Sequence, residues 1–98
     1  MTRTKSEQYR IYGPPERVRW VSNLGCLICG QPAENAHTAS GGTGRKANAD
    51  TIAPLCHEHH HELHQHGART FEERWGVDLK VTAAYVEAKW KETLQATP

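Results

Sequence analysis

The cysteines and histidines of this 98-residue chain are concentrated in one stretch, at spacings typical of metal ligands. Cys26 and Cys29 form a Cys-x-x-Cys pair, and Cys56 and His59 form a Cys-x-x-His pair. A tetrahedral zinc site needs two such pairs, because two intervening residues allow a tight turn that aims both ligands at one ion. The spacing therefore predicts a structural Zn²⁺ bound by these four residues, and the segment between the pairs is long enough to fold as a hairpin.

Two further histidines, His60 and His64, lie four residues apart in a segment with helical character. That spacing places both imidazoles on one helix face, where they can share a second metal ion. A solvated run of histidines on a surface helix is the alternative for this pair. His37 lies upstream as a third histidine outside these spaced pairs in the sequence, and a single histidine of this kind is more often a surface or capping residue than a base.

A glycine-rich basic segment, residues 40–46, follows His37. Glycines such as Gly44 let the backbone approach a phosphate closely, and Arg45 and Lys46 beside exposed amides form an anion-binding patch. The segment is not a P-loop, because the pattern GxxxxGK[ST] is absent. Its composition alone is equally compatible with an ordinary flexible connection in a hairpin.

The length of the chain indicates a single domain, and only 37% of its residues are hydrophobic. A core of this size is modest, so we expect structural zinc to supply stability that apolar burial cannot, and metal removal to unfold the chain. All three cysteines are assigned to the zinc, which favours a reducing compartment over a secreted disulfide framework. No signal peptide or apolar run of membrane length is visible, so we expect a cytoplasmic protein with no membrane partner.

The net charge is only +1, but the basic residues are unevenly distributed. Residues 1–46 hold seven basic and three acidic side chains, whereas the remainder holds five basic and eight acidic ones. A nucleic-acid binder gains most of its affinity from neutralised phosphates. One half of the molecule is therefore a candidate for facing DNA and the other for facing solvent or a protein partner, although solvated charges would give the same distribution.

The N-terminal part of the chain is predicted to contain an arm followed by one short helix. Residues 1–13 have no sustained hydrophobic period and are expected to be a flexible arm, either disordered or ordered by a partner. Pro14 and Pro15 open a short helix that ends before Gly25.

The middle of the chain is predicted to form a hairpin followed by a helix. The strands are expected over residues 33–37 and 51–54, with the glycine-rich segment between them. The helix is expected from about residue 57 to residue 66, and Gly67 ends it.

The C-terminal region, residues 70–95, is predicted to contain two helices. Thr70 and Glu73 make a capping box for a short helical turn that ends at Gly76. A last helix runs from about residue 79 to residue 94, and its apolar residues form one stripe that we expect to pack on the hairpin and its helix. A partner-binding face is the less favoured interpretation. The stripe consists of Leu79, Ala83, Val86, Trp90 and Leu94.

The order of these motifs resembles that of a known enzyme superfamily. The chain contains, in order, CxxC, Ala-His at 36–37, the glycine-rich basic segment, IAPLCHEHH and a further histidine. Over roughly residues 26–66, this order resembles that of the HNH endonucleases of the ββα-metal (His-Me finger) superfamily. The resemblance is closest to the small phage and prophage type, including the RecA-dependent recombination nucleases. It implies an α+β fold, with a zinc-stabilised ββα-metal core at about 26–66 and flanking helices, in a single HNH domain over residues 14–98.

The resemblance also implies roles for individual residues. His37 matches the first histidine of the motif, which is the general base, and His60 and His64 match the histidines that bind the catalytic divalent ion. Thr51 lies near the position of the central asparagine that fastens the hairpin loop, which is one departure. Ala36 is a second departure, because many HNH enzymes place a third metal ligand there. The ion is then held by two histidines with water and phosphate, or Asp50 completes the set.

The chemistry of phosphodiester hydrolysis agrees with these roles. It needs an activated water, charge neutralisation on the phosphate and stabilisation of the leaving oxygen. A histidine with an ordinary pKa of about 6.5 can accept the proton of the water at neutral pH. We therefore expect His37 to act as base and a divalent ion, Mg²⁺, Mn²⁺, Ni²⁺ or Zn²⁺, to serve as Lewis acid.

The sequence thus predicts a metal-dependent endonuclease that nicks or cuts DNA with low specificity, because so small a chain has little surface for base readout. A recombinase filament or a phage packaging partner would supply targeting, and we expect a monomer or weak homodimer. The alternative is a zinc-stabilised DNA-binding or adaptor module that kept the scaffold and lost catalysis. RNA is not favoured as substrate, because no RNA-recognition motif is visible.

Overall fold

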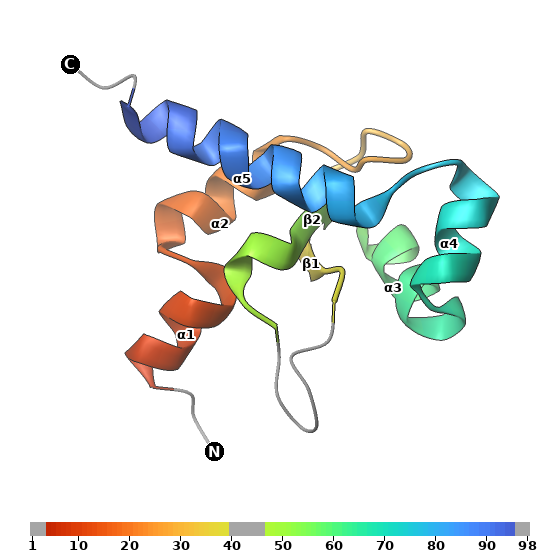
Figure 1. Cartoon of the computed structure of the whole chain (residues 1–98), viewed down its shortest axis with the longest axis horizontal. Helices are drawn as coiled ribbons and strands as arrows, with labels where there is room; N and C mark the ends of the chain where they lie inside the picture. The colour runs from red at the N-terminus through yellow and green to blue at the C-terminus, as the bar shows by residue number, and fades with distance from the viewer. Residues whose placement is uncertain (1–3, 40–46, 96–98) are drawn as a thin grey trace.

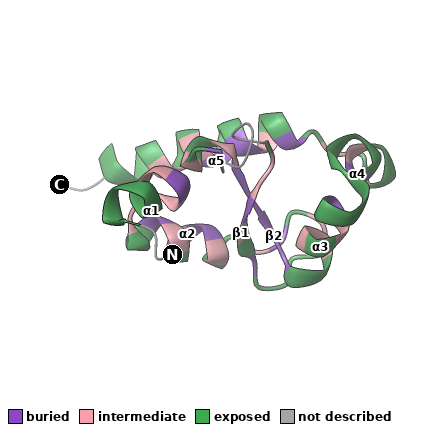
Figure 2. Cartoon of the chain, turned by 90° about the horizontal axis from the view of Figure 1, so that it is seen from below, coloured by how far each residue is buried: buried purple, intermediate pink, exposed green. Residues whose placement is uncertain are grey.

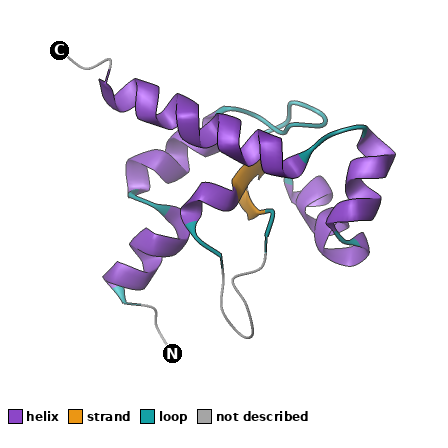
Figure 3. Cartoon of the chain, viewed as in Figure 1, coloured by secondary structure: helices purple, strands orange, loops and turns teal. Residues whose placement is uncertain are grey.

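The computed structural model describes residues 4–39 and 47–95 and shows a small α+β fold around a two-stranded sheet (Figure 1). The predicted fold class, at the level of α+β, is therefore confirmed. Helices account for most of the described chain, as Figure 3 shows. They are α1 (Lys5–Tyr12), α2 (Pro15–Asn23), α3 (His57–His66), α4 (Ala68–Trp75) and α5 (Leu79–Gln95), with a 3-10 helix η1 (Ala49–Thr51) and strands β1 (Glu34–His37) and β2 (Ile52–Leu55).

The hairpin lies at the centre of the molecule. Its strands are antiparallel, with Glu34 opposite Leu55 and His37 opposite Ile52. Every residue of β2 is buried. Because successive side chains of a strand point to opposite faces, a strand buried throughout must be covered on both faces. Figure 2 shows α1 and α2 on one side of the hairpin and α3 and α4 on the other, with α5 running across it.

Two groups of buried side chains result from this arrangement, one for each side of β2. The α2-side cluster contains Val21, Ile52 and Val86. The α3-side cluster is larger, but two of its members are cysteines. It consists of Cys26, Ala36, Leu55, Cys56, Leu63, Phe71 and Leu79.

Helix α5 lies across the hairpin, as its apolar stripe predicted, and contacts β2 and η1. Val86 is buried in the α2-side cluster, and Trp90 packs against Trp20 with ring centroids 5.5 Å apart. Leu94 departs from the prediction, because it is 58% exposed. The last turns of α5 extend past the hairpin toward the C-terminus in Figure 1, so the apolar stripe is longer than the surface on which it packs. Within the described residues, no helix combines the length and apolar character needed to cross a membrane.

The region that was expected to be an arm is instead helix α1, so that prediction was wrong. The Thr4 side chain accepts a hydrogen bond from the Glu7 amide (3.1 Å) and caps the first turn. Ile11 is only 2% exposed, and Arg10 Nη1 donates to Asn48 Oδ1 (2.9 Å). A helix attached by one buried isoleucine shows no apolar period in the sequence, which is why the pattern did not reveal it.

Two smaller corrections concern helix and strand boundaries. Thr70 does not cap a helix, because α4 begins at Ala68 and the Phe71 amide donates to the Gly67 carbonyl (3.1 Å). Gly67 has φ 84°, a conformation that glycine adopts readily, and the chain passes through it directly from α3 into α4. The second strand begins one residue later than predicted, because Thr51 belongs to η1.

Candidate functional site

The first predicted ligand pair lies in a tight turn between α2 and β1. The Gly30 amide donates to the Cys26 carbonyl (2.9 Å), which closes the turn. Gly25 has φ 82°, and a Cβ at this position would lie 3.0 Å from the Gly30 carbonyl oxygen, so the turn requires glycine here. The Leu27 amide donates to the Pro54 carbonyl (2.9 Å) and attaches the turn to β2.

The second pair lies at the start of α3, where Cys56 precedes the helix and His59 belongs to its first turn. Cys56 Sγ is 3.1 Å from His59 Nδ1 and 3.7 Å from Cys29 Sγ, and Cys26 Sγ is 3.6 Å from the same His59 nitrogen. One ligand atom from each of the four residues lies within 4.8 Å of the other three. The structure thus brings together the four residues that the spacing predicted, and they could hold a metal ion such as zinc.

Neighbouring side chains orient the histidine of this Cys₃His cluster. The His59 ring packs edge-on against Trp75 of α4, with centroids 5.1 Å apart. Trp75 is held in turn by a hydrogen bond from its Nε1 to Glu62 Oε2 (3.0 Å). Partners of this kind fix the direction of a metal ligand. Helix α4 is therefore part of the support of the cluster.

The thiols of the cluster differ in acidity. Burial raises the pKa of Cys26, but hydrogen bonds from the backbone of Cys56, Cys29 and Ile28 outweigh burial and lower it to about 6. The backbone of Gln31 lowers the pKa of Cys29, whereas desolvation and the two neighbouring thiols raise it, and the net change is upward. Thiolates rather than thiols bind metals, so Cys26 is largely in its ligand form at neutral pH.

The histidine pair predicted to share a second ion lies side by side on α3. The Nε2 atoms of His60 and His64 are 3.1 Å apart, and the ring centroids are 4.9 Å apart. The His60 side chain is 22% exposed, and His64 is exposed. At this separation the two nitrogens can share one proton, or both can bind one metal ion at the usual metal–nitrogen distance of about 2.1 Å.

A carboxylate that sequence reasoning missed contacts this pair. Glu34 Oε1 accepts a hydrogen bond from His60 Nδ1 (2.7 Å), and its Oε2 is 3.1 Å from His57 Nδ1. The hydrogen bond with His60, followed by that with His57, holds the pKa of Glu34 below its usual range. Strand alternation was the available signal, because Glu34 and Ala36 lie two residues apart and share the face of β1 that is turned toward α3.

His37 ends β1, and its side chain contacts α1. Its Nε2 lies 2.7 Å from the Ile11 carbonyl oxygen, and its ring packs edge-on against Tyr12 with centroids 5.1 Å apart. A carbonyl oxygen can only accept, so Nε2 carries the proton and Nδ1 is the acceptor nitrogen of the neutral ring. The helix that the sequence did not predict therefore determines the tautomer of the predicted base.

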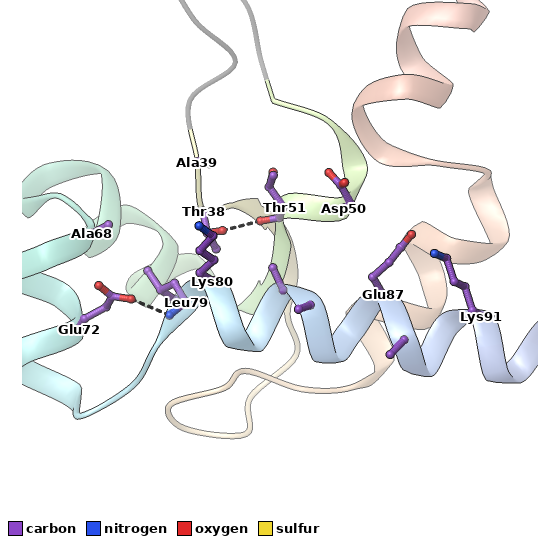
Figure 4. Close-up of a pocket in the computed structure, with 13 residues that line it drawn as sticks. Thr38, Ala39, Asp50, Thr51, Ala68, Glu72, Leu79, Lys80, Glu87 and Lys91 are labelled. Atoms are coloured by element: carbon purple, nitrogen blue, oxygen red, sulfur yellow. Dashed lines mark hydrogen bonds between the residues drawn. The ribbon is translucent and has the colours of Figure 1, made fainter.

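Thr51 closes the described base of the hairpin loop. Its carbonyl accepts from the amide and the Oγ1 of Thr38 (2.9 and 2.7 Å), and its own Oγ1 donates to the Asn48 carbonyl (2.8 Å). Asp50, the other candidate metal ligand, lies beside Thr51 in a groove of about 790 Å³ between this end of the hairpin and α5 (Figure 4). The predicted phosphate contacts lie outside the described residues; they are Gly44, Arg45 and Lys46.

One bacterial relative matches most of this chain. The uncharacterized protein YdfU of Escherichia coli (strain K12) is 36% identical over 73 residues. The match covers 70% of this chain and 21% of the relative, so the chain spans about a fifth of the length of the curated relative that it matches. No solved structure matches. The model of a family described as a protein of unknown function, DUF968, matches residues 1–91, and the chain therefore belongs to that family.

Proposed function

We propose that this chain is a metal-dependent HNH-type endonuclease that hydrolyses DNA phosphodiester bonds with low sequence specificity. The observation that carries the proposal is the order of its parts: His37 ends β1, β2 leads into α3, and α3 presents two imidazoles with their Nε2 atoms 3.1 Å apart. In this proposal β1, β2 and α3 form a ββα-metal core, and the other helices flank it.

The Cys₃His cluster is proposed to bind a structural Zn²⁺. It joins the turn before β1 to the start of α3, so a bound zinc would fix the angle between the hairpin and the helix. A structural zinc site is closed, with all four ligands from the protein. The cluster offers four such ligands, which supports a scaffolding role for it and leaves the reaction to the remaining histidines.

His60 and His64 are proposed to hold the catalytic ion through their Nε2 atoms. A divalent ion held there, Mg²⁺, Mn²⁺, Ni²⁺ or Zn²⁺, would neutralise charge on the phosphate and would stabilise the leaving oxygen. Both imidazoles lie on one helix face, so they would leave room at the ion for water and a phosphate oxygen. Ala36 cannot contribute a ligand, and it is fully buried.

His37 is proposed to be the general base. The Ile11 carbonyl holds the Nε2 proton, and the neutral ring then accepts the proton of the attacking water at Nδ1. The same hydrogen bond stabilises the imidazolium that forms, because its donor stays in place when the ring becomes charged. This arrangement assigns α1 a part in the reaction as the element that orients the base.

Cleavage of supercoiled plasmid tests the proposal. Zinc-loaded wild type, His37→Ala and the matched control His61→Ala are compared with Mg²⁺, Mn²⁺, Ni²⁺ or EDTA, after circular dichroism has established equal folding. His61 is an exposed histidine of α3, so its loss controls for removal of an imidazole. We expect ion-dependent nicking by wild type and His61→Ala, and a rate lower by about 100-fold or more for His37→Ala. Equal rates for all three proteins would exclude His37 as the base.

The alternative is a zinc-stabilised DNA-binding or adaptor module without catalysis. Two observations favour it: buried Ala36 offers no third metal ligand, and Thr51 rather than asparagine closes the base of the hairpin loop. The same experiment separates the two functions. Inactivity of the folded wild type with every ion, together with DNA binding in a gel-shift measurement, would support the adaptor.

A further inference from the structure

We propose that Glu34 is a positioning residue that orients His60 toward His64 and thereby prepares the ion site. The inference rests on the proposed function, because it assumes an ion at the histidine pair. Glu34 is not one of the residues that match the HNH motif in the sequence. Three observations carry it: the direction of the hydrogen bond, the position of the two Nε2 atoms, and the location of Glu34 in the sheet.

The hydrogen bond determines which nitrogen of His60 can bind an ion. Glu34 Oε1 lies 2.7 Å from His60 Nδ1, and an ionised carboxylate only accepts. The proton of the neutral ring therefore lies on Nδ1, and the lone pair lies on Nε2. That Nε2 is the nitrogen that faces His64, at 3.1 Å. A ligand histidine that donates its other N–H to a carboxylate is a recurrent feature of metal sites, and such a carboxylate raises the basicity of the ligand.

The same geometry argues that Glu34 acts through His60 rather than as a ligand. The carboxylate lies on the Nδ1 edge of the ring, whereas the pair of nitrogens that can share an ion lies on the Nε2 edge. Consistently, the only group of at least three ligand atoms close enough to hold an ion, among the described residues, is the Cys₃His cluster. Glu34 is therefore a partner of a ligand.

The rigidity of β1 makes this hydrogen bond a fixed support. Glu34 is paired with Leu55 of β2, next to Cys56, which immediately precedes the ligand-bearing helix. Both ends of the contact are thus connected to the Cys₃His cluster. The second oxygen of Glu34 accepts from His57, whose side chain is 87% exposed, so this contact adds little constraint. We expect Glu34 to place the His60 ring with His57 present or absent.

Site-resolved Mn²⁺ titration tests the inference. Zinc-loaded protein is titrated with Mn²⁺ at one fixed pH, and the paramagnetic broadening of the His60 and His64 signals gives the affinity. The variants are Glu34→Ala, Glu34→Gln, His64→Ala and Glu58→Ala. Glu58 is an exposed acid in the first turn of α3, so its removal controls for the loss of one negative charge near the site.

We expect Glu34→Ala to weaken Mn²⁺ binding by about 10- to 100-fold, as is typical for the loss of a carboxylate that supports a ligand histidine. Glu34→Gln should lose less, because the amide oxygen can still accept the His60 proton. Glu58→Ala should bind as wild type does, and His64→Ala should abolish the broadening. Unchanged affinity in Glu34→Ala, with loss in His64→Ala, would overturn the role of Glu34 and leave the ion site intact.

The ¹⁵N shifts of the His60 ring supply a second readout that needs no ion. We expect the Nδ1–H tautomer in wild type and a mixture of tautomers in Glu34→Ala. The same tautomer in both proteins would contradict positioning by Glu34. Wild type that shows no Mn²⁺ broadening at the pair would overturn the ion site itself, so failure of this inference and failure of the proposed function give different results.

Discussion

The two sides of β2 are stabilised by different means, although they share one four-residue strand. On the α2 side, Ile52 packs with Val21 and Val86, and large side chains such as Trp20 cover them. On the α3 side, Leu55 packs with two cysteines that point into the Cys₃His cluster. The α2-side cluster is therefore apolar throughout, whereas the α3-side cluster includes two of four side chains that could hold a metal ion.

The difference follows from the composition of the helices. Helix α3 is ten residues long and contains six histidines, and Leu63 is its only buried residue. A short helix of this kind has little apolar surface to dock and is marginal by itself. Helix α5 is seventeen residues long and buries Leu79, Ala83 and Val86. The chain thus places two of its four candidate ligands at the start of a short helix that has little apolar surface of its own to dock.

Among the tests of this comparison, removal of a metal ion held by the Cys₃His cluster should have the largest effect. Structural zinc contributes about 10 kcal/mol or more in small zinc domains, which equals or exceeds the total stability of many domains. We expect a strong chelator, or Cys29→Ser, to unfold the chain, with loss of the helical circular dichroism signal. Cys29 is exposed, so the effect of its substitution is not a packing effect.

Hydrogen exchange then shows whether the two sides are one cooperative unit. Because β2 belongs to both clusters, we expect the amides of Val21 and Val86 to lose protection together with those of Leu63 and Phe71 when the metal is removed. Persistent protection of Val21 and Val86 in the chelated protein would contradict this expectation. It would mean that the α2 side folds without the α3 side.

The partly buried ion pair on the α2 side offers a smaller perturbation. Arg17 is 2% exposed and its Nη2 is 2.8 Å from Glu87 Oε1, while its Nη1 is buried without a hydrogen-bond partner among the described residues. Glu87→Gln leaves the guanidinium buried without its counter-charge, and we expect a loss of about 1–3 kcal/mol in the free energy of unfolding, measured by urea denaturation.

A double variant checks the cause of that loss. Arg17→Met with Glu87→Leu replaces both charges by apolar side chains of similar length, and such replacements are often neutral or stabilising. We therefore expect the double variant to recover the stability that Glu87→Gln loses. A double variant less stable than Glu87→Gln would show that the ion pair itself stabilises this side.

The ligand spacing and the long stripe of α5 were readable from the sequence, because each leaves a regular pattern. Cys26, Cys29, Cys56 and His59 follow a spacing that few other structures require, and the structure brings them together. Leu79, Ala83 and Val86 follow the helical period of a docked face. The helical period is a property of one segment. The ligand pattern is a property of two segments, each with a fixed internal spacing.

Contacts between segments without such a pattern were not readable. Helix α1 docks through Ile11, which leaves no period in residues 5–12, and its hydrogen bond with His37 joins residues 26 positions apart. Glu34 looks like a solvated strand residue until the register of the hairpin brings it to His60. Ile11 and Glu34 contact the histidines that are proposed to act in the reaction. The contacts that support the site are therefore the part that the sequence did not predict.

The smallest expected effect concerns a surface ion pair on the α3 side. Arg69 Nε lies 3.5 Å from Glu73 Oε1 on α4, and the side chains are 94% and 71% exposed. Exposed pairs with this helical spacing typically contribute about 0.3–0.5 kcal/mol, because water screens them and long side chains lose freedom in forming them. We expect a double-mutant cycle of Arg69→Ala and Glu73→Ala to give a coupling energy no larger than this, and smaller still in high salt.

Helix α4 would then be held by buried Phe71 and by Trp75, which packs on the candidate ligand His59. A coupling energy well above this range would mean that surface charge also holds the α3 side, and the contrast between the two sides of β2 would weaken.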